Sequence, residues 1–213
     1  METSEAIRTR RTLKVLADPA QPFPVDDGAL EPHLAELLEL ASWAPFHKPA
    51  DDAHRGGPLD SAVPWRFTVL PSSSCRSLVA WVDREGVQMG KMSHMLSAAS
   101  ACLVATWLPD PAEGLGFQEF EPTLRNMEHI AAASAAVQNL LLAGTDRGFE
   151  TYWSTGGLFR TEKVYDKLEI PRVEVLLGSI FLFPADTRGV PAFPGALRER
   201  RGGIESWSRV VRL

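Results

Sequence analysis

The longest apolar stretch of the chain covers residues 127–143 and has the pattern of a buried helix. It contains no proline or glycine, and its apolar side chains point to most sides of the helix: Ile130, Ala131, Val137, Leu140, Leu141 and Leu142. A helix with so little polar surface belongs inside a globular core. We expect Gly144 and Gly148 to end it, and the amides of Gln138 and Asn139 to need hydrogen-bond partners.

Apolar and β-branched runs predict strands before and after this helix. Residues 64–70 alternate between polar and apolar side chains, which is typical of a strand. Residues 101–108 and 171–183 are almost continuously apolar, which indicates strands covered on both faces. Residues 149–153 form a further short strand that follows the long helix directly.

Helical spacing of apolar residues predicts helices over 28–43 and 72–85 as well. A shorter helix is expected over 161–168, with Thr161 as its N-cap. Strands flanked by helices on both sides indicate an α+β fold with three layers.

Two segments rich in polar residues, glycine and proline stand apart from these elements. Residues 49–63 interrupt the chain between the first long helix and the first strand. Residues 184–213 hold too few apolar side chains for a core of their own. We expect this tail to lie across another surface, such as that of a partner subunit.

Composition narrows the class of protein. The 213 residues carry a net charge of −5 and no lysine-rich tract, which argues against a nucleic-acid partner. We expect one domain over 1–213, no signal peptide and no membrane span, because no apolar run reaches the necessary ~18 residues. Cys75 and Cys102 lack metal-ligand spacing, so reduced thiols in a cytoplasmic protein are expected.

Two short motifs are candidates for ligand binding. Residues 8–12 read Arg-Thr-Arg-Arg-Thr, and guanidinium and hydroxyl groups together suit a phosphate; a solvated chain terminus is the alternative. Residues 154–157 read Ser-Thr-Gly-Gly, a turn that exposes backbone N–H groups; an ordinary β-turn is the alternative.

Other kinds of site have weaker support. A metal site built from His47, Asp51, Asp52 and His54 lacks further ligands, so no metal is expected. The chain has no Gly-x-Ser-x-Gly motif of esterases and no Gly-x-Gly-x-x-Gly motif of dinucleotide folds.

The order of the motifs resembles that of the nitroreductase family of FMN-dependent oxidoreductases. The chain has Arg-Arg-Thr at 10–12, Pro-Trp-Arg-Phe at 64–67, and Gly-Phe followed by Trp-Ser-Thr-Gly within 148–156. The resemblance covers residues 8–179. It is closest to the small branch with an Ala-Pro-x-His-Lys loop, which reads Ala-Pro-Phe-His-Lys here at 44–48.

The resemblance implies a three-layer α/β/α sandwich with a mixed, mostly antiparallel central sheet. It implies a homodimer that exchanges its C-terminal extension, 184–213, between subunits. It also implies FMN as cofactor, NADH or NADPH as reductant, and a small-molecule acceptor such as a nitroaromatic or a quinone. The chemistry is that of the flavin, so no catalytic side chain is expected.

The resemblance also assigns roles to individual residues. Arg10, Arg11 and Thr12 would bind the phosphate and ribityl chain, with Arg200 chosen from Arg198, Arg200 and Arg201 as a further phosphate ligand. Trp43 and His47 would reach the flavin from the second subunit. The residues expected along the isoalloxazine ring are Trp153, Ser154, Thr155 and Gly156.

The sequence departs from the family pattern before the first strand. Val63 stands where a glutamine commonly precedes Pro-Trp, and the insertion 49–63 is longer than this branch usually has. The insertion would form a lid or displace His47. A non-catalytic flavin- or tetrapyrrole-binding protein on the same scaffold therefore stays open as an alternative, as does dehydrogenation of an amide or peptide ring.

Overall fold

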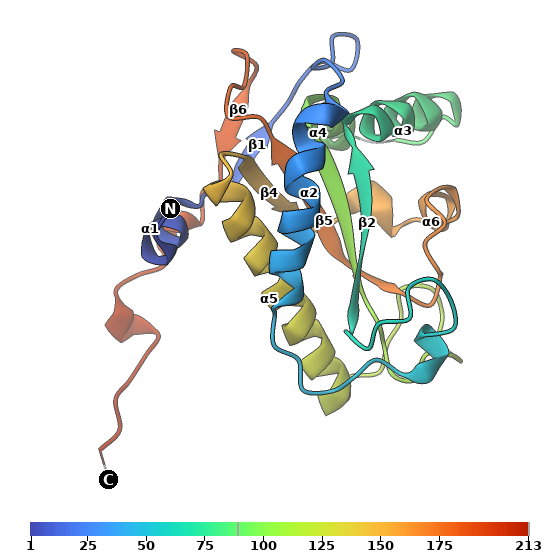
Figure 1. Ribbon diagram of the computed structural model, residues 1–213, viewed down its shortest axis with the longest axis vertical. Coiled ribbons are helices and arrows are strands. Elements are labelled where there is room, and N and C mark those ends of the chain that lie inside the picture. The colour runs from blue at the N-terminus through green and yellow to red at the C-terminus, as the bar shows by residue number, and fades with distance from the viewer. Residues whose placement is uncertain (89, 213) are drawn as a thin grey trace.

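The computed structural model describes residues 1–88 and 90–212 and is built around a four-stranded sheet (Figure 1). The strand order is β2 (Trp65–Pro71), β3 (Ala101–Trp107), β5 (Val175–Phe183) and β4 (Glu150–Ser154). Each neighbouring pair is antiparallel. These are the four segments that the apolar runs predict, so the strand predictions are confirmed.

Alternate residues of β3 face two different layers of helices, because successive side chains of a strand point to opposite faces. Leu103 packs in a cluster with leucines of α2 and α5, whereas Cys102 packs in a cluster with α3, α4 and α6. The three-layer α+β fold is therefore confirmed. The helices of the two outer layers are α2 (Asp27–Ser42), α5 (Leu124–Asp146), α3 (Ser72–Arg84), α4 (Lys91–Ala98) and α6 (Glu162–Lys167).

A second, two-stranded sheet joins the two ends of the chain. Strand β1 (Leu13–Val15) pairs antiparallel with β6 (Ala192–Pro194). A single parallel bridge between Thr12 and Thr151 connects this pair to the edge strand β4. Within the described residues, this bridge is the one parallel pairing, so the sheet is mixed only at that point.

Short helical segments complete the chain: α1 (Thr3–Thr9), η1 (Asp52–His54), η2 (Gly157–Arg160), η3 (Arg198–Arg200) and η4 (Ile204–Ser206). The first of these shows that the Arg-Thr-Arg-Arg-Thr motif begins in the last turn of a helix and is not a frayed end. Beyond β6 the chain extends away from the sheet (Figure 1), and Trp207 and Val210 are 68% and 86% exposed.

Helix α5 is longer than the sequence predicts, because it continues through Gly144 to Asp146. The expectation that Gly144 ends the helix is wrong. A Cβ at Gly144 would lie 3.3 Å from the side chains of Leu182 and Thr151, so this glycine allows the helix to pack closely on the sheet. Gly148, with φ +81°, is the glycine that follows the helix end.

One stripe of α5 is exposed, which corrects the expectation of a helix buried on nearly every side. Leu124 and Met127 are 72% and 61% exposed, and Ala131 and Gln138 continue the stripe at helical spacing. The Gln138 amide thus reaches solvent, while Asn139 donates a 3.4 Å hydrogen bond to the Leu40 carbonyl. No helix within 1–88 and 90–212 is long and apolar enough to cross a membrane.

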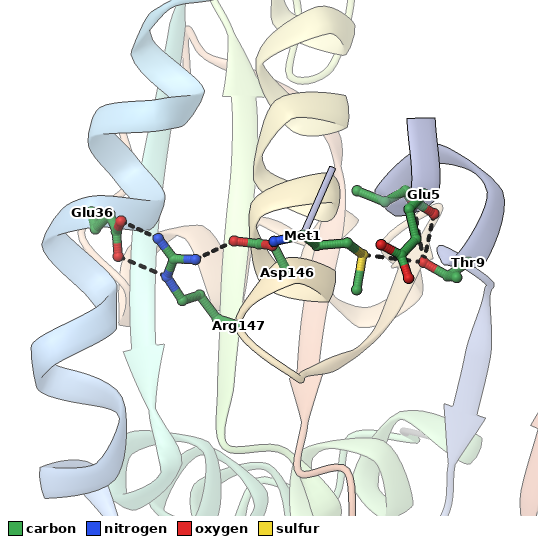
Figure 2. Close-up of polar contacts among 7 residues, drawn as sticks. Met1, Glu5, Thr9, Glu36, Asp146 and Arg147 are labelled. Atoms are coloured by element: carbon green, nitrogen blue, oxygen red, sulfur yellow. Dashed lines mark hydrogen bonds and ion pairs between the residues drawn. The ribbon is translucent and has the colours of Figure 1, made fainter. Parts of the chain in front are cut away.

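Arg147, directly after α5, connects this helix to α2 (Figure 2). Its Nε donates to Glu36 Oε2 at 2.9 Å, and its Nη2 donates to Glu36 Oε1. Asp146 accepts from Arg147 and also lies 2.7 Å from the Met1 amino group. These ion pairs fix the two helices of one layer side by side.

The short helix α6 begins after Thr161, as predicted, but Thr161 does not cap it with its side chain. The hydroxyl instead donates to the Leu158 carbonyl at 2.9 Å. This bond ties the helix start to the preceding 3₁₀ turn, η2.

Candidate functional site

A cleft of about 1120 Å³ lies where β1, β4 and the segment after β6 meet. Because β1 and β6 pair, residues from the two ends of the chain face each other across it. The lining residues are Arg10, Arg11, Thr12, Lys14, Tyr152, Trp153, Phe193, Pro194, Gly195, Ala196, Leu197, Arg198, Glu199 and Arg201. We refer to this site as the arginine cleft.

Arg10 is a half-buried cation at this cleft and has other cations as neighbours. Burial lowers the pKa of Arg10, and the charges of Arg201 and Arg198 lower it further. Arg198 holds the chain in place by donating from Nη1 to the Arg10 carbonyl at 2.8 Å. Within the part of the chain that the structure describes, none of these guanidiniums has a carboxylate within 4.0 Å. An anion bound there would relieve their mutual repulsion.

Arg11 differs from its neighbour because it already has an anionic partner. Its guanidinium donates to both carboxylate oxygens of Glu150, at 2.6 Å and 3.2 Å. Thr12, the next residue, accepts a 2.9 Å hydrogen bond at its carbonyl from the Gly195 N–H. These contacts fix the backbone of 10–12 against β4 and the segment after β6.

Aromatic side chains form the wall of the cleft beside β4. The Lys14 ammonium lies 5.0 Å from the centre of the Tyr152 ring, a cation–π contact. Trp153 is 36% exposed and lies over Gly178 of β5. A Cβ at Gly178 would overlap the indole nitrogen of Trp153 and the Ser154 carbonyl, so only glycine leaves room for this arrangement.

The turn after Trp153 lies next to the cleft along the chain, but its residues do not line it. The Ser154 side chain is buried and its hydroxyl accepts from the Gly156 N–H at 3.3 Å. Thr155 is exposed, and its carbonyl accepts from Arg160 at 2.8 Å. Gly156 has φ +105°, a conformation that favours glycine.

The sequence matches the family described as "Nitroreductase family" over residues 24–182. That match covers most of the chain. The chain belongs to the nitroreductase family. Residues 10–12 precede the matched segment, so the arginine motif lies outside it.

Several solved structures of nitroreductases have the same fold. A nitroreductase-like family protein from Bacillus cereus is 22% identical, with a TM-score of 0.65 over 99% of this chain and 96% of that one. A nitroreductase from Bacteroides fragilis with bound FMN is 16% identical, with a TM-score of 0.58 over 99% and 100%. An FMN- and NADPH-dependent nitroreductase from Sphigopyxis sp. strain HMH is 16% identical, with a TM-score of 0.57 over 100% of both chains.

Neither Trp43 nor His47 lines the arginine cleft of its own chain. Trp43 is the C-cap of α2, and His47 follows it in the loop toward η1. Both side chains are exposed, and the Trp43 indole donates to Glu39 on the same helix. Within one chain these two residues therefore form no part of the arginine cleft.

Arg200 also lies outside the cleft lining, whereas Arg198 and Arg201 belong to it. From this segment Leu197, Arg198, Glu199 and Arg201 line the cleft, so position along the turn η3 does not by itself separate Arg200 from its neighbours. Tyr152 is a further lining residue that the sequence motifs did not identify.

The insertion 49–63 is an ordered loop held mainly by Arg66 of β2. This arginine is 7% exposed and donates to the carbonyls of Leu59, Ser61, Val63 and Trp65 at 2.8–3.0 Å. The loop ends meet through a 2.9 Å bond from the Ala50 N–H to the Ala62 carbonyl. His54 contacts the Pro109 carbonyl at 2.7 Å. Among the described residues, no group of three potential metal ligands occurs in this loop or elsewhere.

Proposed function

We propose that this nitroreductase-family protein is an FMN-dependent oxidoreductase driven by NADH or NADPH. The observation that carries the proposal is the arginine cleft, where Arg10, Arg198 and Arg201 have no carboxylate within 4.0 Å among the described residues and lie beside an aromatic wall. FMN has a dianionic phosphate and a flat ring, and both ends find matching groups here. FMN in the related Bacteroides fragilis structure supports the same cofactor.

In this proposal, Arg10 and Thr12 bind the phosphate and ribityl chain, assisted by Arg198 and Arg201. Arg200 contributes indirectly, by belonging to the turn that presents its two neighbours. Arg11 positions the segment through Glu150 and adds positive charge at the edge of the cleft. The bidentate pair leaves fewer donors free for a phosphate.

The isoalloxazine ring is proposed to lie against Trp153 and the turn formed by Ser154, Thr155 and Gly156. Lys14, whose ammonium lies over Tyr152, adds positive charge on this side of the cleft. Positive charge near the ring favours uptake of electrons, which is the protein's share of flavin chemistry. When bound, FMN supplies the hydride chemistry, so no side chain is assigned as acid, base or nucleophile.

We propose a homodimer in which Trp43 and His47 of one chain complete the flavin site of the other. The exposed apolar stripe of α5 and the exposed side chains of the tail support this arrangement, because such surface is normally covered. Only the part of the extension after η3 would then cross the partner subunit, because residues 192–199 and Arg201 pair with β1 or line the arginine cleft of their own chain. The cysteines Cys75 and Cys102 are free and buried, which agrees with a cytoplasmic location.

The acceptor is proposed to be a small electron-poor compound, such as a nitroaromatic or a quinone. The route is ping-pong, in which the oxidised nucleotide leaves before the acceptor binds. The insertion 49–63, held by Arg66, would act as a fixed wall that limits acceptor size. Its bonded loop ends and anchored carbonyls support a wall more than a mobile lid.

An absorbance spectrum of freshly purified protein, followed by anaerobic titration with each nucleotide, tests the proposal. We expect flavin absorbance that NADH or NADPH bleaches, and the more effective nucleotide identifies the reductant. A bound flavin that neither nucleotide reduces would favour a binding protein without catalysis. A colourless protein that does not take up added FMN would contradict the proposal entirely.

A further inference from the structure

A second cleft lies on the other helical layer, between α3, α4 and the proline-rich segment 19–22. Its volume is about 660 Å³, within the ~300–1,000 Å³ typical of small-molecule sites. It shares no lining residue with the arginine cleft. On α3 its lining residues are Arg76, Val79, Ala80 and Asp83, whose spacing places them on one face of the helix.

Arg76 provides a positive charge at this cleft that has no direct ion-pair partner among the described residues, although the more distant Asp27 carboxylate acts on it. The guanidinium is partly buried, and its Nε donates to the Phe23 carbonyl at 3.3 Å while its Nη1 donates to the Leu96 carbonyl. Within residues 1–88 and 90–212, no carboxylate lies within 4.0 Å of it and its Nη2 has no acceptor. A guanidinium has five N–H donors, so capacity for a further acceptor remains.

Ser97 of α4 adds a buried hydroxyl group to this cleft. The residue lines the same cleft and is 1% exposed. Its hydroxyl has no hydrogen-bond partner in the described part of the chain. Buried hydroxyls are almost always bonded, so a ligand that reaches both Ser97 and Arg76 would satisfy two groups together.

The rest of the lining combines apolar side chains with the polar groups of Gln88 and Ser93, and its apolar part is where the body of a ligand would lie. Pro19 and Pro22 line one side, and Val79 and Ala80 line the other. Asp83 lies two helical turns from Arg76, roughly 10 Å along α3. An anionic head therefore belongs at the Arg76 end, with an apolar body directed along the helix.

We propose that this cleft binds a small carboxylate with an apolar body, its head at Arg76 and Ser97. The competing explanation is that Arg76 only ties the 19–23 segment to the end of α4. The two explanations differ in whether an added carboxylate binds and in whether filling the cleft prevents binding.

Calorimetric titration of the flavin-loaded protein with octanoate, and with 1-octanol as the uncharged match, tests the proposal. Octanoate should bind about tenfold or more tightly than 1-octanol, because a charge-assisted bond is lost in the alcohol. Arg76→Gln should weaken octanoate binding by about tenfold or more, while Arg84→Gln, outside the lining on the same helix, should not.

A second variant protects the test against a folding defect at Arg76. Ala80→Leu leaves Arg76 intact but fills the cleft, whereas Ser77→Leu adds the same bulk on exposed surface of α3 outside the lining. Octanoate should bind to Ser77→Leu and fail to bind to Ala80→Leu. Arg10→Ala, compared with native protein when both are freed of flavin, should keep octanoate binding, which distinguishes this cleft from the arginine cleft. Equal affinity for both probes, unchanged binding to Ala80→Leu, or no binding at all would overturn the proposal.

Discussion

The Arg11 guanidinium lies 2.6 Å from Glu150, whereas its chain neighbour Arg10 has the positive charges of Arg198 and Arg201 as its main electrostatic neighbours. We therefore expect the two residues to respond differently to mutation. Arg10→Ala should weaken FMN binding about ten- to a hundredfold, since a charge-assisted hydrogen bond contributes about 1.5–3 kcal/mol. Arg11→Ala should retain most of its flavin and lose at most ~1 kcal/mol of stability, because the pair is exposed.

Flavin absorbance per protomer, measured after dialysis, checks this prediction. The double variant Arg10→Ala/Arg11→Ala should be colourless while remaining folded. Full flavin occupancy in the double variant would show that the phosphate assignment is wrong.

Gly178 should be essential for the aromatic wall of the arginine cleft. Gly178→Ala would bring a Cβ into the Trp153 indole and the Ser154 carbonyl, so the indole or the strand has to move. We expect a loss of about 1–3 kcal/mol in the free energy of unfolding, as for overpacked cores, together with weaker FMN binding. Gly57→Ala is the control, because a Cβ there meets no atom within 4 Å. Urea unfolding and flavin titration of both variants measure the difference.

Glu174 should make stability depend on pH. Burial raises the pKa of this carboxyl, although the Thr106 hydroxyl and the Arg66 charge act in the opposite direction. The folded state then holds the proton more tightly than the unfolded state. The contribution of Glu174 is therefore complete below about pH 4.3, the unfolded pKa, and is lost as pH rises through the folded pKa.

Glu174→Gln removes this titration while keeping an oxygen that can accept from Thr106. Relative to the native protein, the variant should gain stability as pH rises from about 4 to 7. Urea midpoints of both proteins across this range provide the measurement. If the native protein instead became more stable relative to the variant as the pH rises, the Glu174 pKa would not be raised by folding.

Arg66 should determine the order of the insertion 49–63. Arg66→Lys keeps the charge but cannot reach four carbonyls with one planar group. We expect a loss of about 1–3 kcal/mol and faster amide exchange at Ala50, whose N–H closes the loop. Arg55→Lys, in an exposed pair with Asp52 in the same loop, is the matched control. Equal exchange in both variants would mean that other contacts hold the loop.

The exposed stripe of α5 should control dimer formation. Met127→Glu/Ala131→Glu places like charges on a surface that, in the proposed dimer, faces another subunit. The dimer should weaken by about a hundredfold or more, because facing like charges cost several kcal/mol. Sedimentation equilibrium checks this, with Ser77→Glu on α3 as the control. Loss of flavin together with the dimer would support a site shared between subunits, and a dimer that survives would place the interface elsewhere.

The periodicity of apolar residues predicted the layers of the fold well, because the side of a strand or helix that faces the core has to be apolar along its whole length. The continuous apolar run of β3 follows from helices on both of its faces, and β3 is buried along its full length. The end of α5 could not be predicted, because the glycine at 144 is explained by close packing on the sheet, against Thr151 of β4 and against Leu182 of β5, which is distant in sequence.

The candidate site was only partly predictable for the same reason. Residues 10–12 stand out by composition, but their difference in pairing depends on Glu150, from a strand 139 residues further along. The choice among the C-terminal arginines required the three-dimensional course of the segment after β6, which places Arg198 and Arg201 in the cleft lining. Trp43 and His47 are proposed to act in the site of a second chain. Contacts between subunits cannot be read from the periodicity of one chain, and within one chain the two residues are simply exposed.

The contact between Arg198 and the Arg10 carbonyl joins residues 188 positions apart, so the arginine cleft closes only after nearly the whole chain has been made. During synthesis, Arg10 leaves the ribosome long before Arg198 and Arg201 exist, so a nascent chain cannot yet assemble the FMN site proposed above. Proteolytic removal of the segment after β5 would have the same effect on mature protein, because the sheet β2–β3–β5–β4 contains none of it. With FMN in this cleft, as proposed, the flavin absorbance of a preparation would then report the fraction of molecules that keep the extension 184–213.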